Sequence, residues 1–113
     1  SLLLHGKNAW QNVTLAPGKS YIARLSASDP DGDELRYQWA VREESQATAE
    51  GGDFEEAIEE IDGLIENTTL RHIVLRAPDA PGAYRLFVEI HDGKGHAGYA
   101  NLPFRVQVEA ARR

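Results

Sequence analysis

The sequence predicts an all-β fold in which short antiparallel strands form a β-sandwich of about seven strands. Several short runs alternate apolar and polar residues with a period of two, which is the pattern of a half-buried strand. The segments between these runs combine Gly with Asp or Pro, residues that favour tight turns. Short alternating strands joined by such turns pack as two sheets around one core. The chain of 113 residues has the length of a single domain, residues 1–113.

The alternation places the strands in chain order. A short strand is expected at 13–15, with residues 2–4 as its first half. The longer runs are 21–27, 35–42, 69–76, 84–91 and 102–108. In the run 69–76, Ile73 and Leu75 form the expected inward pair. In the run 35–42, one face carries Leu35, Tyr37, Trp39 and Val41. Because side chains alternate between the two faces of a strand, this parity places Trp39 in the core.

The turns and one proline limit how these strands can pair. Four segments separate the runs: APGKS at 16–20, DPDGD at 29–33, DAPG at 79–82 and DGKG at 92–95. Pro103 lies inside the last predicted strand. Because proline has no backbone N–H to donate to a neighbouring strand, we expect this strand to run on a sheet edge or to carry a bulge there.

A middle insertion, residues 43–68, breaks the strand pattern. Its residues at helical spacing are Phe54, Ala57, Ile58 and Ile61. Asp53 and Glu56 have the spacing of a capping box at the start of this stretch. These features predict a short helix, and a solvated acidic loop with a few apolar anchors is the alternative. In either case we expect the anchors Phe54, Ile58 and Ile61 to pack on the domain's own sheet, over Phe87.

The composition excludes several classes of protein. The chain has no Cys, so disulfides, thiolate metal sites and a Cys nucleophile are excluded. No apolar run approaches the roughly 20 residues of a membrane span, and no signal peptide is visible. The net charge is −6, with the acids concentrated between residues 29 and 66 and the basic residues scattered. A nucleic-acid module would show a basic face with interleaved aromatics, so we expect no nucleic-acid partner.

Two strings resemble the immunoglobulin-like sandwich modules of the PKD and cadherin-like group: ASDPDGDELRYQW at 27–39 and APGAYRLFVEIHDGKGHAG at 80–98. After Trp39 the PKD family typically continues Asp-Phe-Gly-Asp-Gly, whereas this chain has Ala40, Val41 and Arg42, so it is PKD-like. The resemblance implies an immunoglobulin-like fold and an accessory module of secreted bacterial multidomain proteins, such as glycoside hydrolases. It also implies that Tyr84 forms a tyrosine corner, whose hydroxyl bonds a nearby backbone group.

No pattern of catalytic residues is present in the sequence, and we expect the chain not to be an enzyme. No Ser lies in a nucleophile-elbow motif, and no Gly-rich loop precedes a helix. Glycosidase chemistry needs two carboxylates that face each other across a cleft, and a small sandwich offers no evident cleft. Trp10 and Tyr99 lie near turn residues and are the candidates for exposed aromatics on which a sugar ring could stack.

The stretch SDPDGD at 28–33 is the candidate metal site. Asp29, Asp31 and Asp33 match the first three ligand positions of an EF-hand loop, but Glu34 and Ala40 stand where that loop needs Gly and Glu. In an immunoglobulin-like sandwich, the loop before Trp39 and the loop after Ile90 lie at the same end. Asp92 is then the fourth expected calcium ligand. The alternative is a tight turn in which the Asp side chains cap backbone N–H groups.

From these features we expect a non-catalytic accessory, spacer or scaffolding module of a larger secreted, carbohydrate-active bacterial protein. The expected location is extracellular or periplasmic, and the expected partner is a neighbouring domain of the same polypeptide. Calcium is the only cofactor considered, and a monomer is expected. An autonomous glycan-binding module with a polysaccharide partner is the first alternative. A repeat of a surface adhesin is the second.

Overall fold

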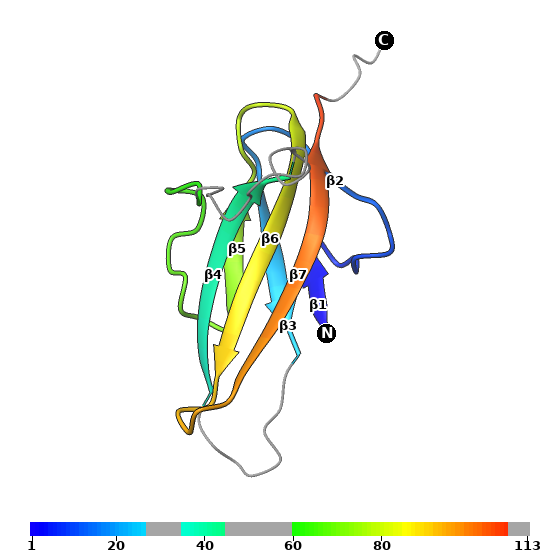
Figure 1. The fold of residues 1–113 in the computed structure, drawn as a ribbon. Helices are drawn as coiled ribbons and strands as arrows, with labels where there is room; N and C mark the ends of the chain where they lie inside the picture. The colour runs from blue at the N-terminus through cyan, green and yellow to red at the C-terminus, as the bar shows by residue number, and fades with distance from the viewer. Residues whose placement is uncertain (27–34, 45–59, 109–113) are drawn as a thin grey trace, which may run out of the picture.

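The computed structural model describes residues 1–26, 35–44 and 60–108, and it shows a sandwich of two packed β-sheets (Figure 1). One sheet has the order β1-β3-β5, with β1 at Leu2–Leu4, β3 at Ser20–Leu25 and β5 at His72–Arg76. The other has the order β2-β7-β6-β4, with β2 at Val13–Leu15, β7 at Ala97–Val106, β6 at Gly82–His91 and β4 at Arg36–Glu43. The described residues thus form seven strands and no helix, which confirms the predicted all-β sandwich.

The chain order of the strands gives the sandwich its immunoglobulin-like arrangement. The sheet β1-β3-β5 takes the place of immunoglobulin strands A, B and E, and β4, β6 and β7 take the places of C, F and G. Every strand pair is antiparallel except β2 with β7, which is parallel. The first strand differs from the prediction, because its two halves lie in opposite sheets: β1 pairs with β3, and β2 pairs with β7. Both halves can therefore extend an edge of a sheet.

The core follows the predicted alternation. Trp39 and Val41 on β4, like Ile73 and Leu75 on β5, are buried, while the residues between them face outward. The indole of Trp39 is only 1% exposed, and its Nε1–H donates a hydrogen bond to the carbonyl of Leu70 at 2.7 Å. A buried indole needs such a partner because an unpaired N–H would lose its bond to water.

The segment 60–70 closes one side of the sandwich along the free edge of β4 (Figure 1). The amide of Ile61 donates to the carbonyl of Val41 at 2.8 Å, and the amide of Trp39 donates to the carbonyl of Thr68 at 3.0 Å. Ile61 is half-buried and packs against the core. Of the three predicted anchors, Phe54 and Ile58 lie outside the described residues, as does most of the predicted helix.

The predicted tyrosine corner is present. The hydroxyl of Tyr84 donates to the carbonyl of Ala80 at 2.6 Å, and the ring stacks on Phe104 with 5.6 Å between ring centroids. Burial raises the pKa of Tyr84 above its ordinary value, and the charge of Glu43 adds to this increase. The corner fixes the chain as it passes from the β1-β3-β5 sheet into β6.

The position of Pro103 explains how a strand containing proline can lie inside a sheet. β2 pairs with β7 only from Phe104 to Val106, so β7 has a neighbour on both sides only at its end. Pro103 is the residue just before this pairing begins, and up to that point β7 runs along the sheet edge. The edge expectation therefore holds for Pro103 itself, although β7 as a whole lies between β2 and β6.

Replacing Trp39 by Ala should destabilise the domain by about 3–5 kcal/mol, because it removes the largest fully buried side chain and leaves a cavity. The measurement is the free energy of unfolding in urea. Trp10 is the other tryptophan and is 89% exposed, so Trp10→Ala is the matched control and should change stability little. Equal, small effects of the two substitutions would show that Trp39 is not in the core.

Candidate functional site

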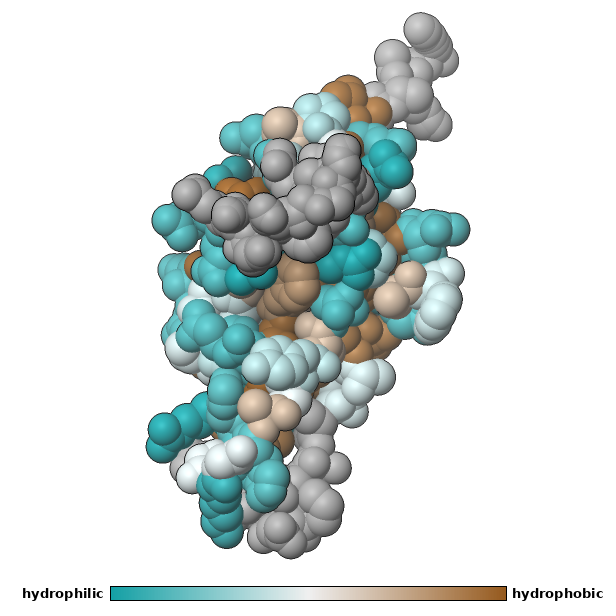
Figure 2. Space-filling model, in the orientation of Figure 1, coloured by the Kyte–Doolittle hydropathy of each residue, from teal (hydrophilic) through white to brown (hydrophobic). Residues whose placement is uncertain are grey.

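One continuous surface of the domain is the outer face of the four-stranded sheet, formed by the side chains of β4, β6 and β7 that point away from the core. Strand register arranges these side chains in rows across the sheet. Three successive rows are Gln38–Glu89–Tyr99, Ala40–Phe87–Asn101 and Arg42–Arg85–Pro103. Figure 2 shows this face, with hydrophobic surface toward the middle and polar side chains on both sides of it. We call these three rows the outer face.

Arg85 is the most firmly held side chain of the outer face. Its Nε donates to Glu44 at 2.6 Å, a terminal nitrogen donates to the second oxygen of Glu44 at 3.1 Å, and the other terminal nitrogen donates to Asn101 Oδ1. The hydrogen bonds that Arg85 donates to the Glu44 carboxylate raise the pKa of Arg85, so the guanidinium is always charged. This fork is bidentate and about two-thirds buried, which orients the guanidinium firmly. The hydrogen bond from Arg85 also orients the side chain of Asn101. Because its Oδ1 faces Arg85, its amide N–H groups point away from Arg85.

Phe87 lies at the centre of the outer face and is partly covered. The guanidinium of Arg42 lies 5.1 Å from the centre of its ring, a cation–π distance, and Arg42 also pairs with Glu60 at 3.3 Å. One face of the ring is therefore occupied. Arg42 directly precedes the insertion. Whether the insertion anchors also cover Phe87 stays a prediction, because Phe54 and Ile58 lie outside the described residues.

Tyr99 is the exposed aromatic of the outer face, with 71% of its surface accessible. It stands directly opposite Glu89 and diagonal to Phe87, at a separation of about 7–8 Å by sheet geometry. In the described part of the chain its ring makes no hydrogen bond or ring contact. The predicted exposure of Tyr99 and of Trp10, which is 89% accessible, is confirmed.

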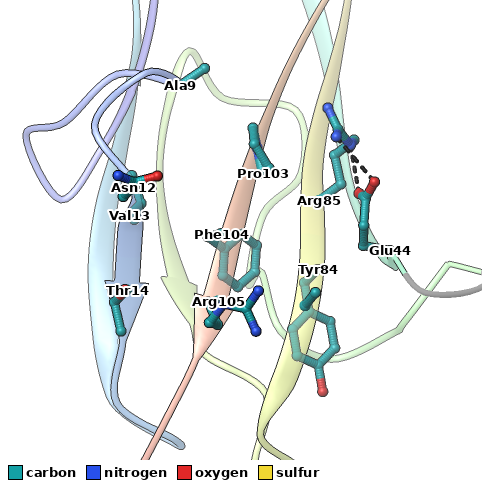
Figure 3. Close-up of a pocket in the computed structure, with 11 residues that line it drawn as sticks. Ala9, Asn12, Val13, Thr14, Glu44, Tyr84, Arg85, Pro103, Phe104 and Arg105 are labelled. Carbon is teal, nitrogen blue, oxygen red and sulfur yellow. Dashed lines mark hydrogen bonds and ion pairs between the residues drawn. The ribbon is translucent and has the colours of Figure 1, made fainter.

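A hollow of about 250 Å³ continues the outer face beyond the row of Arg85 (Figure 3). The loop that carries Ala9 and Asn12 borders it on one side, and the Glu44–Arg85 pair borders it on the other. Trp10 follows Ala9 in the bordering loop. The hollow and the outer face together present fixed charged groups, amides and exposed aromatic rings, which suit binding of a polar ligand.

The predicted metal ligands fall into two groups. Asp29, Asp31 and Asp33 lie outside the described residues. Asp92 is described, and it lies at the end of β6 where His91 pairs with Arg36, the first residue of β4. The start of β4 and the end of β6 therefore lie at the same end of the sandwich. Within the described ranges, no three His, Asp or Glu side chains are grouped to hold a metal ion.

Asp92 organises the hairpin turn between β6 and β7. Its Oδ1 accepts from the backbone amides of Lys94 at 2.7 Å and His96 at 3.2 Å, and its Oδ2 lies 2.8 Å from His96 Nδ1. Gly93 and Gly95 have φ angles of 78° and 90°, which other residues rarely adopt. The hydrogen bond from Lys94, supported by those from His96, lowers the pKa of Asp92 to about 2. Asp92 therefore caps backbone N–H groups within its own turn.

The carboxylates of the outer face are also engaged. Glu44 is held by Arg85, and Glu89 lies 3.2 Å from His91 Nε2. His91 and Asp92 are neighbours in the chain but make separate contacts, His91 with Glu89 and Asp92 with His96. Sequence analysis missed the Arg85–Glu44–Asn101 network. The signal that pointed to it is the parity of β6, because Arg85 and Phe87 alternate with the buried residues.

The comparisons with known proteins give a match among solved structures. No protein-family model and no curated protein matches the chain. Among solved structures, it is similar to a nucleoside hydrolase-related hypothetical protein from Saccharophagus degradans that is associated with carbohydrate metabolism. The TM-score is 0.53 and the sequence identity 18%, and the match covers 96% of this chain but 25% of that protein. At this identity the likeness concerns the fold. No helix within the described ranges has the length and apolar character to cross a bilayer.

The turn at Asp92 predicts a specific acid response. Because the pKa of Asp92 is lowered on folding, its carboxylate stabilises the fold above the ordinary value of 3.8, and this contribution is lost as the pH falls through about 2. The stability difference between the wild type and Asp92→Ala should therefore shrink on acidification between about pH 5 and pH 2. Urea unfolding with chelator present measures it. A carboxyl titration of Asp92 by NMR with a midpoint at its ordinary value would contradict the assignment.

Calcium binding makes a separate prediction. If calcium is held by Asp29, Asp31, Asp33 and Asp92, the melting temperature should rise in millimolar calcium and fall back with chelator. The free energy of unfolding should increase by roughly 2.7 kcal/mol at a hundredfold excess of calcium over Kd. Asp31→Asn should blunt the response. Asp79→Asn, which changes an exposed Asp in another turn, is the control and should leave it intact. Identical melting curves with calcium and with chelator would contradict calcium binding and would mean that the four residues only form turns.

Proposed function

We propose that this chain is a non-catalytic accessory module of a larger carbohydrate-active protein, serving to space or dock its other domains. The observation that carries the proposal is the extent of the structural match. Almost the whole of this chain superimposes on one quarter of a longer protein that is associated with carbohydrate metabolism. A unit that recurs as a fraction of a longer chain is what an accessory module is. The PKD-like turn and strand motifs support the same assignment, and with it an extracellular or periplasmic location.

The chemistry of the described surface supports a binding or docking role. Three carboxylates beside the outer face, Glu44, Glu60 and Glu89, are each paired with a basic side chain. Hydrolysis of a glycoside needs one carboxyl group as an acid and a second as a base or nucleophile, with substrate between them. Paired carboxylates on a flat sheet serve instead to orient neighbouring donors. Calcium, where bound, would fasten the loop end of the sandwich near Asp92.

Two measurements test the proposal together. The purified chain should release no product from a panel of aryl glycosides, polysaccharides and nucleosides, while melting cooperatively as an independent unit. The reading frame that encodes it should also encode a catalytic domain. Hydrolysis by the chain that is lost on Glu89→Gln or Glu44→Gln would overturn the non-catalytic assignment. A reading frame that encodes this domain alone would overturn the accessory role.

A further inference from the structure

We infer that the outer face binds a neutral oligosaccharide, with Tyr99 as its stacking platform and the row of Asn101 as its hydrogen-bonding side. This inference rests on the proposed function and names the ligand class for the site. A pyranose ring has apolar C–H faces and a rim of hydroxyl groups that both donate and accept. Such a ligand needs a flat, accessible aromatic ring next to fixed polar groups, and the outer face offers this combination.

Tyr99 is the ring that is free to stack. Its 71% exposure leaves the ring accessible, whereas the ring of Phe87 carries the guanidinium of Arg42 and Trp39 is buried. Tyr99 also stands on a long strand paired with β6, so its backbone is held by the sheet. Aromatic side chains lose little conformational freedom on binding, and a strand positions them better than a loop.

The polar groups around Tyr99 are oriented before any ligand arrives. Glu89 is its cross-strand neighbour and contacts His91, and Asn101 is two residues along β7 on the same face. Asn101 accepts a hydrogen bond from Arg85 through Oδ1, which directs its two amide hydrogens elsewhere. In the same row as Tyr99, Gln38 donates to Thr68 Oγ1 and keeps its carbonyl oxygen for another donor. Both donors and acceptors are thus held beside the ring.

The charges of the outer face favour a neutral ligand. Arg85 is neutralised by Glu44 and Arg42 by Glu60, so the two central arginines carry little uncompensated charge toward a ligand. Arg42 and Arg85 are the only cationic side chains of the three rows, whereas an acidic polysaccharide or a nucleic acid would need unpaired cations along its path. Arg105 lies outside the three rows and lines the hollow. From Tyr99 to Pro103 the face extends about 13 Å along β7 at the rise of a strand. This length accommodates more than one sugar ring and leads into the hollow beside Arg85.

The test uses the purified chain and four neutral probes: cellohexaose, laminarihexaose, xylohexaose and mannohexaose. Two-dimensional NMR should show that at least one of them shifts the amide signals of Glu89, Tyr99 and Asn101 at millimolar concentration. Tyr99→Ala should weaken that binding by roughly tenfold or more without changing the melting temperature. Asn101→Ala should weaken it as well. Val74→Ala, an exposed apolar residue on the outer side of the other sheet, is the matched control and should leave binding unchanged.

Three results would overturn the inference. One is the absence of binding of all four probes at millimolar concentration. The second is a binding site that maps to the β1-β3-β5 sheet, or binding that Tyr99→Ala leaves intact. The third is a dimer in solution that Tyr99→Ala converts to a monomer, which would assign the outer face to a second copy of the chain. Each of these results leaves the accessory role standing, since that role depends on the hydrolysis panel and on the reading frame.

Discussion

The fold depends most on the burial of Trp39. Its indole fills the space between the two sheets, its Nε1–H is satisfied by Leu70, and its backbone amide joins β4 to the segment that covers the sheet edge. Because the side-chain period of a strand is two, a slip of one residue between β4 and β6 would bring Trp39 to the surface. Burial of this one large side chain therefore excludes every register shifted by an odd number of residues. In the observed register, Trp39 pairs with Val88 of β6, and Val88 pairs with Ala100 of β7.

The same register sorts the remaining side chains of these strands onto the outer face. With Val88 inward, Phe87 and Glu89 must point outward, and Tyr99 and Asn101 follow from their pairing with β6. The outer face is thus a consequence of core packing. Its side chains are held by a sheet that is stabilised by the buried residues on its other side. This arrangement suits an accessory module, since residues that meet a ligand can vary while the core is kept. Arg85 differs from the other side chains of the outer face because it also links strands. From β6 it bonds Glu44, which follows β4, and Asn101 on β7.

Alternation together with the turn residues predicted the fold class and the inward pairs on β4 and β5. The resemblance to immunoglobulin-like modules predicted the role of Tyr84. Alternation could not predict that residues 2–4 and 13–15 join opposite sheets, because both segments are short and apolar and either could extend either edge. It also could not predict the Arg85–Glu44–Asn101 network. Those residues are distant in the sequence and meet only once the strand register is known. The role of Asp92 could not be predicted either, because a carboxylate at this position suits both a tight turn and a cation site. Its hydrogen bonds with Lys94 and His96 are local and form without a cation.

The central claim is that one strand register, in which Trp39 is buried, builds both the core and the outer face. Cross-strand nuclear Overhauser contacts in the isolated chain test it most directly. The account predicts contacts between the backbones of Trp39 and Val88, of Glu89 and Tyr99, and of Phe87 and Asn101. A pattern displaced by one residue, such as Trp39 opposite Phe87 or Tyr99 opposite Val88, would contradict it.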